Sequence, residues 1–445
     1  MTLCLPLKEQ IITLNVVPVI ETPSDETPTS DKTQSAGPSV SNENPTSGHE
    51  RKYKIREVLM RTLEGKAILA SLDGERCISL KQRRAIQRIL VSHLVECFGE
   101  YPTSDVKTSL AVSIVEEFPC LKDHIGNGYE AWFCKGRNKR PSTGFLEECL
   151  RNRRKRALRQ TNPHQAQGQQ GAGSKRPCLV LHDSDITEER AMQMVAWLKV
   201  HVLPLDTVTE YMRDTAIYRA KWIQEHGTRT VAEIQTEFPR LVDTPGMIAQ
   251  DFHSLHPEAS AKLAEKWVSL LSEKILKLAA KERNAVIHLS AMNYNDDTDT
   301  ADMKGDVALQ ILPYLLPGSS YKVAKNSTRP TLDEAKTFFI DKKPVGTNMP
   351  EYLREAGKTR PEPFVLLLGQ DSAFSQVFFV FNGEAQEQRT LLAAVDVCFK
   401  SFYVYDINYP KQCSPTWEFL QTTVYELPGA ESSAVRFLRT TISAL

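Results

Sequence analysis

Apolar residues recur at helical spacing in the segment 51–160. Between Leu80 and Phe98 they fall at intervals of three and four residues, which predicts one buried face of a helix: Ile86, Ile89, Leu90, Leu94 and Phe98. Ser104 or Asp105 can cap a second helix that Pro119 ends, and Gly144 precedes a third. The segment is therefore expected to be a helical domain.

Helical periodicity returns after residue 180. One helix is predicted over 187–202 and another over 206–225, closed by Gly227. Pro257 is placed to begin a long third helix. The apolar stripe of that helix comprises Leu263, Trp267, Leu270, Leu271, Ile275 and Leu278. All of these helices would belong to one region, 181–330.

A short match links the two helical regions. IVEEFPCLKD at 114–123 and IQTEFPRLVD at 234–243 share Ile, Glu, Phe, Pro, Leu and Asp at the same offsets, 120 residues apart. Two interpretations are open. The segments belong to two related helical modules, or two similar helix ends arose by chance.

From about residue 332 the pattern becomes that of strands. PFVLLLG at 363–369 and QVFFVF at 376–381 are short apolar runs rich in branched and aromatic residues, typical of buried strands. Asn382-Gly383 follows and predicts a type I′ hairpin turn. Helices are expected over 391–404 and 415–427.

Two segments lack the apolar positions that a core requires. Of the 30 residues in 21–50, 17 are Ser, Thr, Pro or Gly and none is aromatic, which predicts disorder. The segment 161–177 is rich in Gln and Gly and is expected to be a flexible linker. Residues 11–20 alternate as a strand does, and could be the last strand of a domain whose beginning is absent.

These patterns predict a mostly α multidomain protein with a small α+β C-terminal domain. The predicted parts are a disordered acidic tail at 1–50, a basic helical domain at 51–160, a linker at 161–180, a helical domain at 181–330 and the α+β domain at 331–445. The 445 residues, 41% of them apolar, suffice for a core without disulfides.

The chain is expected to lie inside the cell and outside membranes. Nine cysteines without a repeating spacing fit reduced thiols in the cytosol or nucleus. No apolar run reaches about 18 residues, so no membrane span is expected. The first nine residues lack the basic region of a secretory signal.

The charge is balanced overall but unevenly distributed. There are 55 basic and 55 acidic side chains, yet the net charge is −5 in 1–50, +10 in 51–160, +2 in 161–180 and −7 in 181–445. Such asymmetry points to an anionic partner. The basic segment could equally dock on the acidic half of the same chain.

Clustered cations and nearby aromatic residues make the basic segment a candidate for nucleic-acid binding. Cations bind phosphates, and aromatic rings stack on unpaired bases. The predicted contact residues are Lys81, Arg83, Arg84, Arg88, Trp132, Lys135, Arg137, Lys139, Arg140, Arg151, Arg153, Arg154, Lys155, Arg156 and Arg159. The alternative is a solvated helix face, with Trp132 in the core.

The basic run RNRRKR also predicts a nuclear import signal. Its cations are Arg151, Arg153, Arg154, Lys155 and Arg156, next to the predicted linker. A nuclear location is therefore expected, with a cytoplasmic location as the alternative. The alternative is a basic helix end without any import function, since such helix ends are common.

One acidic segment partly resembles a calcium-binding loop. Asn295, Asp297, Asp299 and Asp306 place oxygens along it, but Thr300 stands where the loop needs Gly, and Asp306 where it needs Glu. A solvated acidic loop is the expected structure.

Other metal and catalytic signals are weak. His93 with Cys97, and Cys120 with His124, could supply four zinc ligands, but no C-x-x-C pair occurs, so buried thiols are expected. The sequence lacks G-x-G-x-x-G, G-x-x-x-x-G-K-[ST], G-x-S-x-G and H-E-x-x-H. No enzyme, metal or cofactor is therefore predicted.

The chain resembles the vertebrate, fish-expanded family of proteins similar to sterile alpha motif domain-containing protein 3. The resemblance rests on stretches at 88–107, 114–123, 128–133, 143–156, 237–252, 363–369, 376–383 and 402–410. It implies no known enzymatic activity and no cofactor. The sterile alpha motif module itself is absent at the N-terminus, so its self-association is not carried over. Some relatives begin with a ubiquitin-like domain, whose last strand residues 11–20 resemble.

Together these observations predict a non-enzymatic nuclear protein that associates with nucleic acid through its basic helical domain. The alternative is a protein-interaction scaffold or adaptor, with the basic face docked on an acidic protein surface and no nucleic-acid contact. An enzyme with a motif-free site is a third hypothesis. The oligomeric state stays open.

Overall fold

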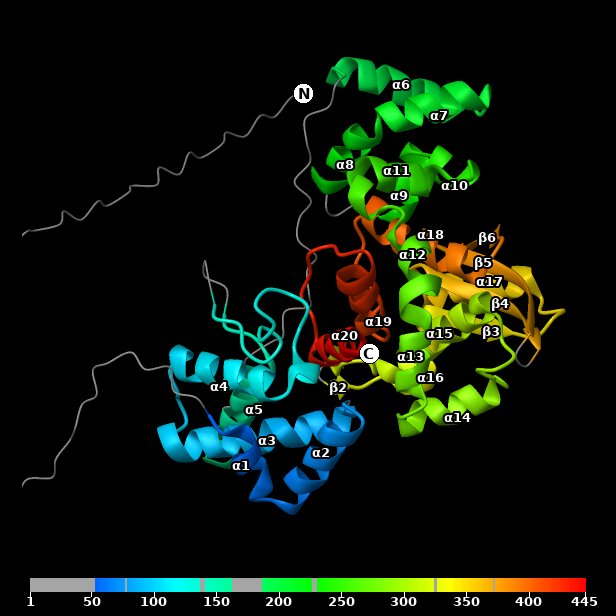
Figure 1. Ribbon diagram of the computed structural model, residues 1–445. Helices are drawn as coiled ribbons and strands as arrows, with labels where there is room; N and C mark the ends of the chain where they lie inside the picture. The colour runs from blue at the N-terminus through cyan, green and yellow to red at the C-terminus, as the bar shows by residue number, and fades with distance from the viewer. Residues whose placement is uncertain are drawn as a thin grey trace, which may run out of the picture. The chain divides into compact units, whose positions relative to one another are not determined.

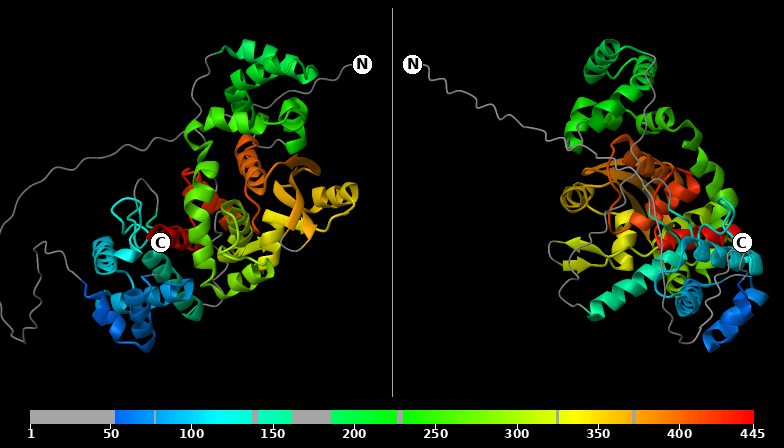
Figure 2. Two further views of the ribbon diagram at one scale, coloured as in Figure 1. Left: turned by 45° about the vertical axis from the view of Figure 1, so that its right-hand side comes forward. Right: turned by 90° about the vertical axis from the view of Figure 1, so that its left-hand side faces the viewer.

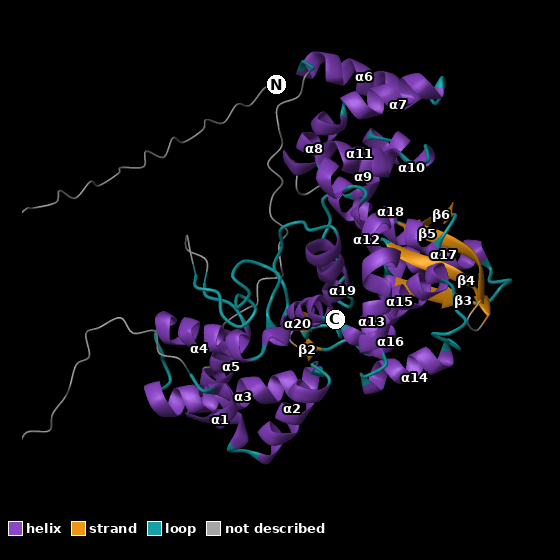
Figure 3. Ribbon diagram, in the orientation of Figure 1, coloured by secondary structure: helices purple, strands orange, loops and turns teal. Residues whose placement is uncertain are grey.

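The computed structural model describes residues 53–76, 78–136, 141–161, 186–225, 230–323, 326–370 and 373–445, without the side chains of 157–161, 322–326 and 370–375. Figure 1 shows these elements in chain order, and Figure 3 shows that helices dominate them. The predicted tail at 1–50, the strand at 11–20, Gly227 and the linker from residue 162 on lie outside the described residues. The expected fold class is confirmed: mostly helix, with a small sheet in the C-terminal part.

The basic segment folds as helices around one core. Its elements are α1 (Ile55–Met60), α2 (Leu63–Gly74), α3 (Leu80–Phe98), α4 (Ser104–Glu117), the 3-10 turn η1 (Pro119–Leu121) and α5 (Phe145–Thr161). The prediction of α3 and of a helix after Gly144 is confirmed. The predicted cap of α4 is wrong, because Thr103 accepts the hydrogen bond, 3.3 Å from the Val106 amide. Gly144 has φ +110°, and a Cβ there would lie 2.6 Å from the Trp132 carbonyl oxygen.

The next region is also helical. Its elements are α6 (Glu188–Val200), α7 (Leu205–Asp214), α8 (Ala216–Glu225), α9 (Val231–Glu237), α10 (Arg240–Asp243), α11 (Met247–Leu255), the 3-10 turn η2 (Pro257–Ala259), α12 (Lys262–Lys266), the π-helix η3 (Trp267–Leu271), α13 (Ser272–Ala279), α14 (Arg283–Ala291) and α15 (Ala301–Leu315).

Two predicted helices of this region are interrupted. The helix expected over 206–225 breaks at buried Thr215, where Arg219 donates to the Met212 carbonyl freed by the break. The helix expected to begin at Pro257 contains η3, whose wider turn points Trp267 at α15. There its Nε1 donates to the Gly305 carbonyl at 2.9 Å. The predicted stripe is therefore broken, and Leu270 is 58% exposed.

The two matching segments share one backbone pattern. Phe118 and Phe238 end their helices at φ/ψ of −128°/83° and −125°/69°. Their amides bond Ile114 and Ile234 carbonyls at 2.9 and 2.8 Å, and the Pro that follows starts a short turn in each case. The residues shared by the two segments thus specify the same buried helix end. Whether they mark related modules stays a prediction.

The C-terminal part carries the sheet. Its elements are β1 (Tyr321–Val323), β2 (Asn326–Thr328), α16 (Leu332–Phe339), β3 (Ile340–Lys343), α17 (Met349–Thr359), β4 (Phe364–Gln370), β5 (Ala373–Phe381), β6 (Glu384–Gln388), α18 (Leu391–Val404), α19 (Ser414–Phe419), the π-helix η4 (Leu420–Val424) and α20 (Ser433–Ala444). The larger sheet has the order β3-β4-β5-β6, with β3 and β4 parallel and the other pairs antiparallel.

Local signals predicted two strands of this sheet, β4 and β5, and the turn that follows them, but not β3. Asn382 and Gly383 have φ of 50° and 79° and join β5 to β6 in the predicted two-residue hairpin. Alternate residues of β4 belong to different cores, Val365 and Leu367 to the one that includes α18, and Leu366 to the one with Ala356 of α17. Because both faces are covered, the strand is continuously apolar.

The cores do not follow the predicted segments throughout. One continuous core contains residues of both predicted domains 181–330 and 331–445. The core of the first five helices also contains Phe437 of α20. Figure 2 shows α20, in red, beside those blue and cyan helices. The last helix of the chain is therefore part of the basic helical domain as well.

Candidate nucleic-acid interface

A groove between α3 and α5 brings five predicted cations together. Helical spacing puts Arg84 and Arg88 on one face of α3, and Arg153 and Arg156 on one face of α5. The groove has a volume of about 720 Å³ and is also lined by Arg83, Glu100 and Glu148. Five cationic and two anionic side chains therefore border the groove.

The groove cations differ in their partners within the chain. Arg88 Nη2 donates to both carboxylate oxygens of Glu64, at 3.0 and 3.1 Å, and Arg153 Nε donates to Glu100 at 3.0 Å. Exposed pairs of this kind contribute little to stability, so a phosphate can replace the carboxylate. Arg84 and Arg156 are exposed and form no ion pair with the described residues.

The Cys149 thiol lines the same groove as these guanidinium groups. Burial raises the pKa of the Cys149 thiol, and Arg156, Arg88 and Arg153 all act in the opposite direction. Three cations from two helices thus act on one sulfur atom. An anion at this position would lie within reach of the same three charges.

Two predicted contact residues are buried, which corrects their role. Trp132 is 2% exposed, its Nε1 donates to the Leu121 carbonyl at 3.2 Å, and its ring meets Phe145 edge-on. It cannot stack on a base and is a core residue instead. Arg83 is 3% exposed, with its guanidinium carbon 4.2 Å from the Phe145 ring centroid. It cannot reach a nucleic-acid backbone outside.

Other predicted residues face elsewhere. Arg154 donates to the Glu100 carbonyl at 2.9 Å and lies over Tyr101, and Arg151 donates to the Ser142 carbonyl at 3.2 Å. Lys135 lies 3.5 Å from Asp105, Lys81 borders a neighbouring hollow beside α2, and Lys155 is exposed outside the groove. The side chains of Arg137, Lys139, Arg140 and Arg159 lie outside the described residues. The import role of 151–156 stays a prediction.

Sequence reasoning missed the polar groups at one end of the groove. Ser433 of α20 borders it and donates a hydrogen bond to Glu148. Arg436 Nη1 binds the other oxygen of Glu148 at 2.8 Å. No local signal could have placed residues 285 positions away on this groove. Gln87 and Asn152, by contrast, share the faces of the predicted cations.

The predicted metal signals do not converge in the described part of the chain. No group of three or more His, Cys, Asp or Glu residues gathers there as metal ligands would. In the acidic segment Asn295 and Asp299 close a hydrogen-bonded loop of their own, and Asp306 lies within α15. Every helix of the described ranges is too short or too polar to cross a bilayer.

Asp306, the last residue of the acidic segment, predicts that the stability of the protein depends on pH. Burial raises the pKa of this carboxyl to about 6, and the like charge of Asp302 acts in the same direction. Because the unfolded pKa is about 4, the folded state binds the proton more tightly, so stability falls as pH rises from about 4 through 6. Asp306→Asn is expected to raise the unfolding temperature at pH 7.5 and to flatten this slope. Thermal unfolding from pH 4 to 8 measures it, with exposed Asp297→Asn as the control. If the unfolding temperatures of D306N and wild type changed with pH in the same way, this prediction would be wrong.

Comparisons with known proteins assign neither a family nor a function to this chain. A scan against protein-family models found no match, and neither curated proteins nor solved structures gave a significant match. The resemblance to the sterile alpha motif domain-containing protein 3 group stays a prediction. The function must therefore be argued from the groove itself.

Proposed function

We propose that the protein binds the phosphate backbone of nucleic acid in the groove between α3 and α5. The observation that carries the proposal is the convergence of Arg84, Arg88, Arg153 and Arg156 on one hollow. Phosphates bind clustered guanidinium groups through charge-assisted hydrogen bonds. The groove supplies these groups from two rigid helices, which keeps them in place before binding.

The contacts of this proposal are to the backbone and not to base faces. Trp132 and Phe133 are 2% and 0% exposed, so neither ring can stack on a base. Binding then depends on charge density and carries little sequence information. A duplex, which presents more phosphates per unit length, is expected to bind more tightly than a single strand.

Charge reversal at Arg84 and Arg156, the groove cations that form no ion pair with the described residues, is the direct test. Arg84→Glu with Arg156→Glu leaves the buried core intact, since both side chains are exposed. The full chain is titrated with fluorescent 20-base-pair and 20-nucleotide oligonucleotides from 50 to 200 mM salt. Four backbone contacts predict a loss of about 100-fold in wild-type affinity across this range. The double variant is expected to lose about two units of the logarithmic salt slope.

A variant with the same change of net charge serves as the control. Arg354→Glu with Lys358→Glu alters two exposed cations of α17, 66% and 64% exposed. It is expected to bind like wild type. Equal losses in both double variants would show a nonspecific charge effect, and no wild-type binding at 50 mM salt would exclude the proposal.

A second candidate is an acidic protein surface as the partner of the same groove. The favouring observation is that Arg88 already holds both oxygens of a carboxylate, that of Glu64. Labelled polyglutamate in the same titration separates the two candidates. Polyglutamate binding that requires Arg84 and Arg156, and that duplex DNA does not displace, would favour the scaffold.

A further inference from the structure

Arg83 is a buried cation without a matching anion. It projects from α3 and is 3% exposed, with its guanidinium carbon 4.2 Å from the Phe145 centroid and 4.7 Å from that of Phe437. Its Nε and Nη1 have no hydrogen-bond partner among the described residues. Contact with two ring faces offsets part of the desolvation of a cation, but leaves these donors unsatisfied.

The carboxylate that opposes the charge of Arg83 already has other hydrogen-bond partners. Among the described residues, Glu148 is the carboxylate that acts on Arg83, and its oxygens bind Arg436 and Ser433. Burial lowers the pKa of Arg83 to about 9, with Arg84 and Arg436 adding to the effect and Glu148 opposing it. Arg83 thus stays charged at pH 7 while the neighbouring arginines add to the positive potential.

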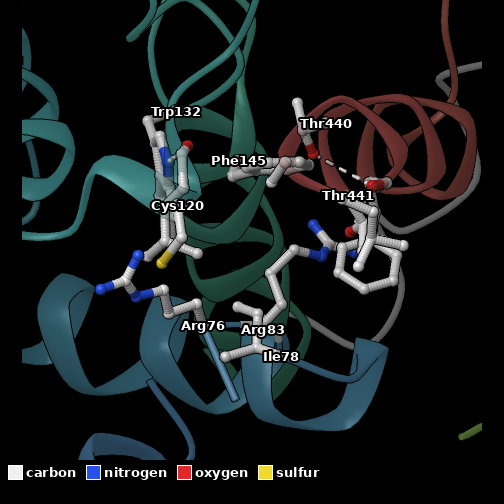
Figure 4. Close-up of a pocket in the computed structure, with 12 residues that line it drawn as sticks. Arg76, Ile78, Arg83, Cys120, Trp132, Phe145, Thr440 and Thr441 are labelled. Carbon is white, nitrogen blue, oxygen red and sulfur yellow. Dashed lines mark hydrogen bonds between the residues drawn. The ribbon is translucent and has the colours of Figure 1, made fainter. Parts of the chain in front are cut away.

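A small cavity adjoins these donors. Its volume is about 20 Å³, enough for one water-sized species, and Arg76, Arg83, Cys120, Trp132, Thr440 and Thr441 border it. Figure 4 shows Arg83 pointing between Phe145 and Thr441, while Arg76 points toward Cys120 and Trp132. Thr440 and Thr441 donate to the carbonyls of their own helix, and Trp132 donates to Leu121. Among the described residues that border the cavity, Arg83 is the arginine whose buried donors lack a partner.

We propose that this cavity binds a monovalent inorganic anion of the size of chloride against Arg83. An anion satisfies the orphaned N–H groups and neutralises the buried charge, whereas a water molecule does only the first. Bound there, the anion joins α20 to α3 and α5, and it connects Arg83 with Phe437, 354 residues further along the chain. It would strengthen the docking of the last helix.

Chloride-dependent stability of the full chain tests this site. Thermal unfolding is compared in sodium chloride, sodium bromide and sodium gluconate at equal ionic strength, since gluconate is too large for the cavity. Wild type is expected to unfold about 1–3 °C higher in chloride and bromide than in gluconate. Arg83→Met should lose this difference. Arg354→Met, an exposed cation of α17 that does not border the cavity, should keep it.

A direct measurement keeps the proposal falsifiable if Arg83→Met folds poorly. Chlorine-35 magnetic resonance of wild type is expected to show excess line broadening, which bromide removes by displacing chloride and which Arg354→Met retains. No excess broadening, together with equal unfolding temperatures in chloride and gluconate, would overturn the proposal and leave water as the occupant. The outcome is independent of oligonucleotide binding in the groove, which the charge-reversal variants measure separately.

Discussion

Asp251→Ala is expected to lower the free energy of unfolding by about 3–5 kcal/mol. The carboxylate of Asp251 on α11 binds Arg219 of α8, with Nε 2.9 Å from Oδ2 and Nη2 2.5 Å from Oδ1. Both side chains are buried, at 1% and 3% exposure. Removing the carboxylate leaves a guanidinium in the core without its counter-charge, which is far more costly than losing a surface pair. Urea unfolding at pH 7 measures the loss.

An exposed pair of the same chemistry provides the control. Asp73 binds Arg56 at 2.6 and 2.9 Å, but these side chains are 53% and 42% exposed. Asp73→Ala is expected to change stability far less than Asp251→Ala, because water screens the exposed pair. The double variant Arg219→Met with Asp251→Leu removes both buried charges and should recover much of the loss. A loss below 1 kcal/mol in D251A would show that the pair is not a structural anchor.

The sequence predicted elements wherever a local rule dominates. The bounds of α3 follow from its apolar face, and the β5–β6 hairpin follows from Asn382-Gly383, whose positive φ values few other pairs tolerate. α18 occupies the predicted 391–404. In each case the residues that decide the structure are neighbours in the chain.

The missed features depend on partners that are distant in the chain. The break at Thr215 and the wide turn at Trp267 are held by Arg219 and by the Gly305 carbonyl, which no window of sequence reveals. Arg83 is instructive, because one signal was present. It precedes Ile86 and Leu90 by three and seven residues and therefore shares their buried face, whereas Arg84 and Arg88 face the groove. Interpreting the basic run as one surface patch does not separate buried Arg83 from exposed Arg84 and Arg88.

Arg439→Met is expected to cause a second large loss of stability, also about 3–5 kcal/mol. Arg439 of α20 binds Asp123, which follows η1, and both oxygens of Glu431 at 2.8 and 2.9 Å. Asp123 is 1% and Arg439 4% exposed at their side chains, so methionine would leave a buried carboxylate without its guanidinium partner.

The segments in which hydrogen exchange becomes faster distinguish two roles for Arg439: docking α20 on the first helices, or stabilising α20 alone. Beside it, Ser443 lies 2.8 Å from His124 and Phe437 enters the core of the first helices. Hydrogen exchange in R439M should therefore rise both in 433–444 and in 119–128. Adding Asp123→Asn removes the stranded charge and should restore part of the stability. Arg354→Met, 66% exposed on α17, is the control and should change little. Faster exchange confined to 433–444 would mean that α20 is not what holds the turn after α4 in place.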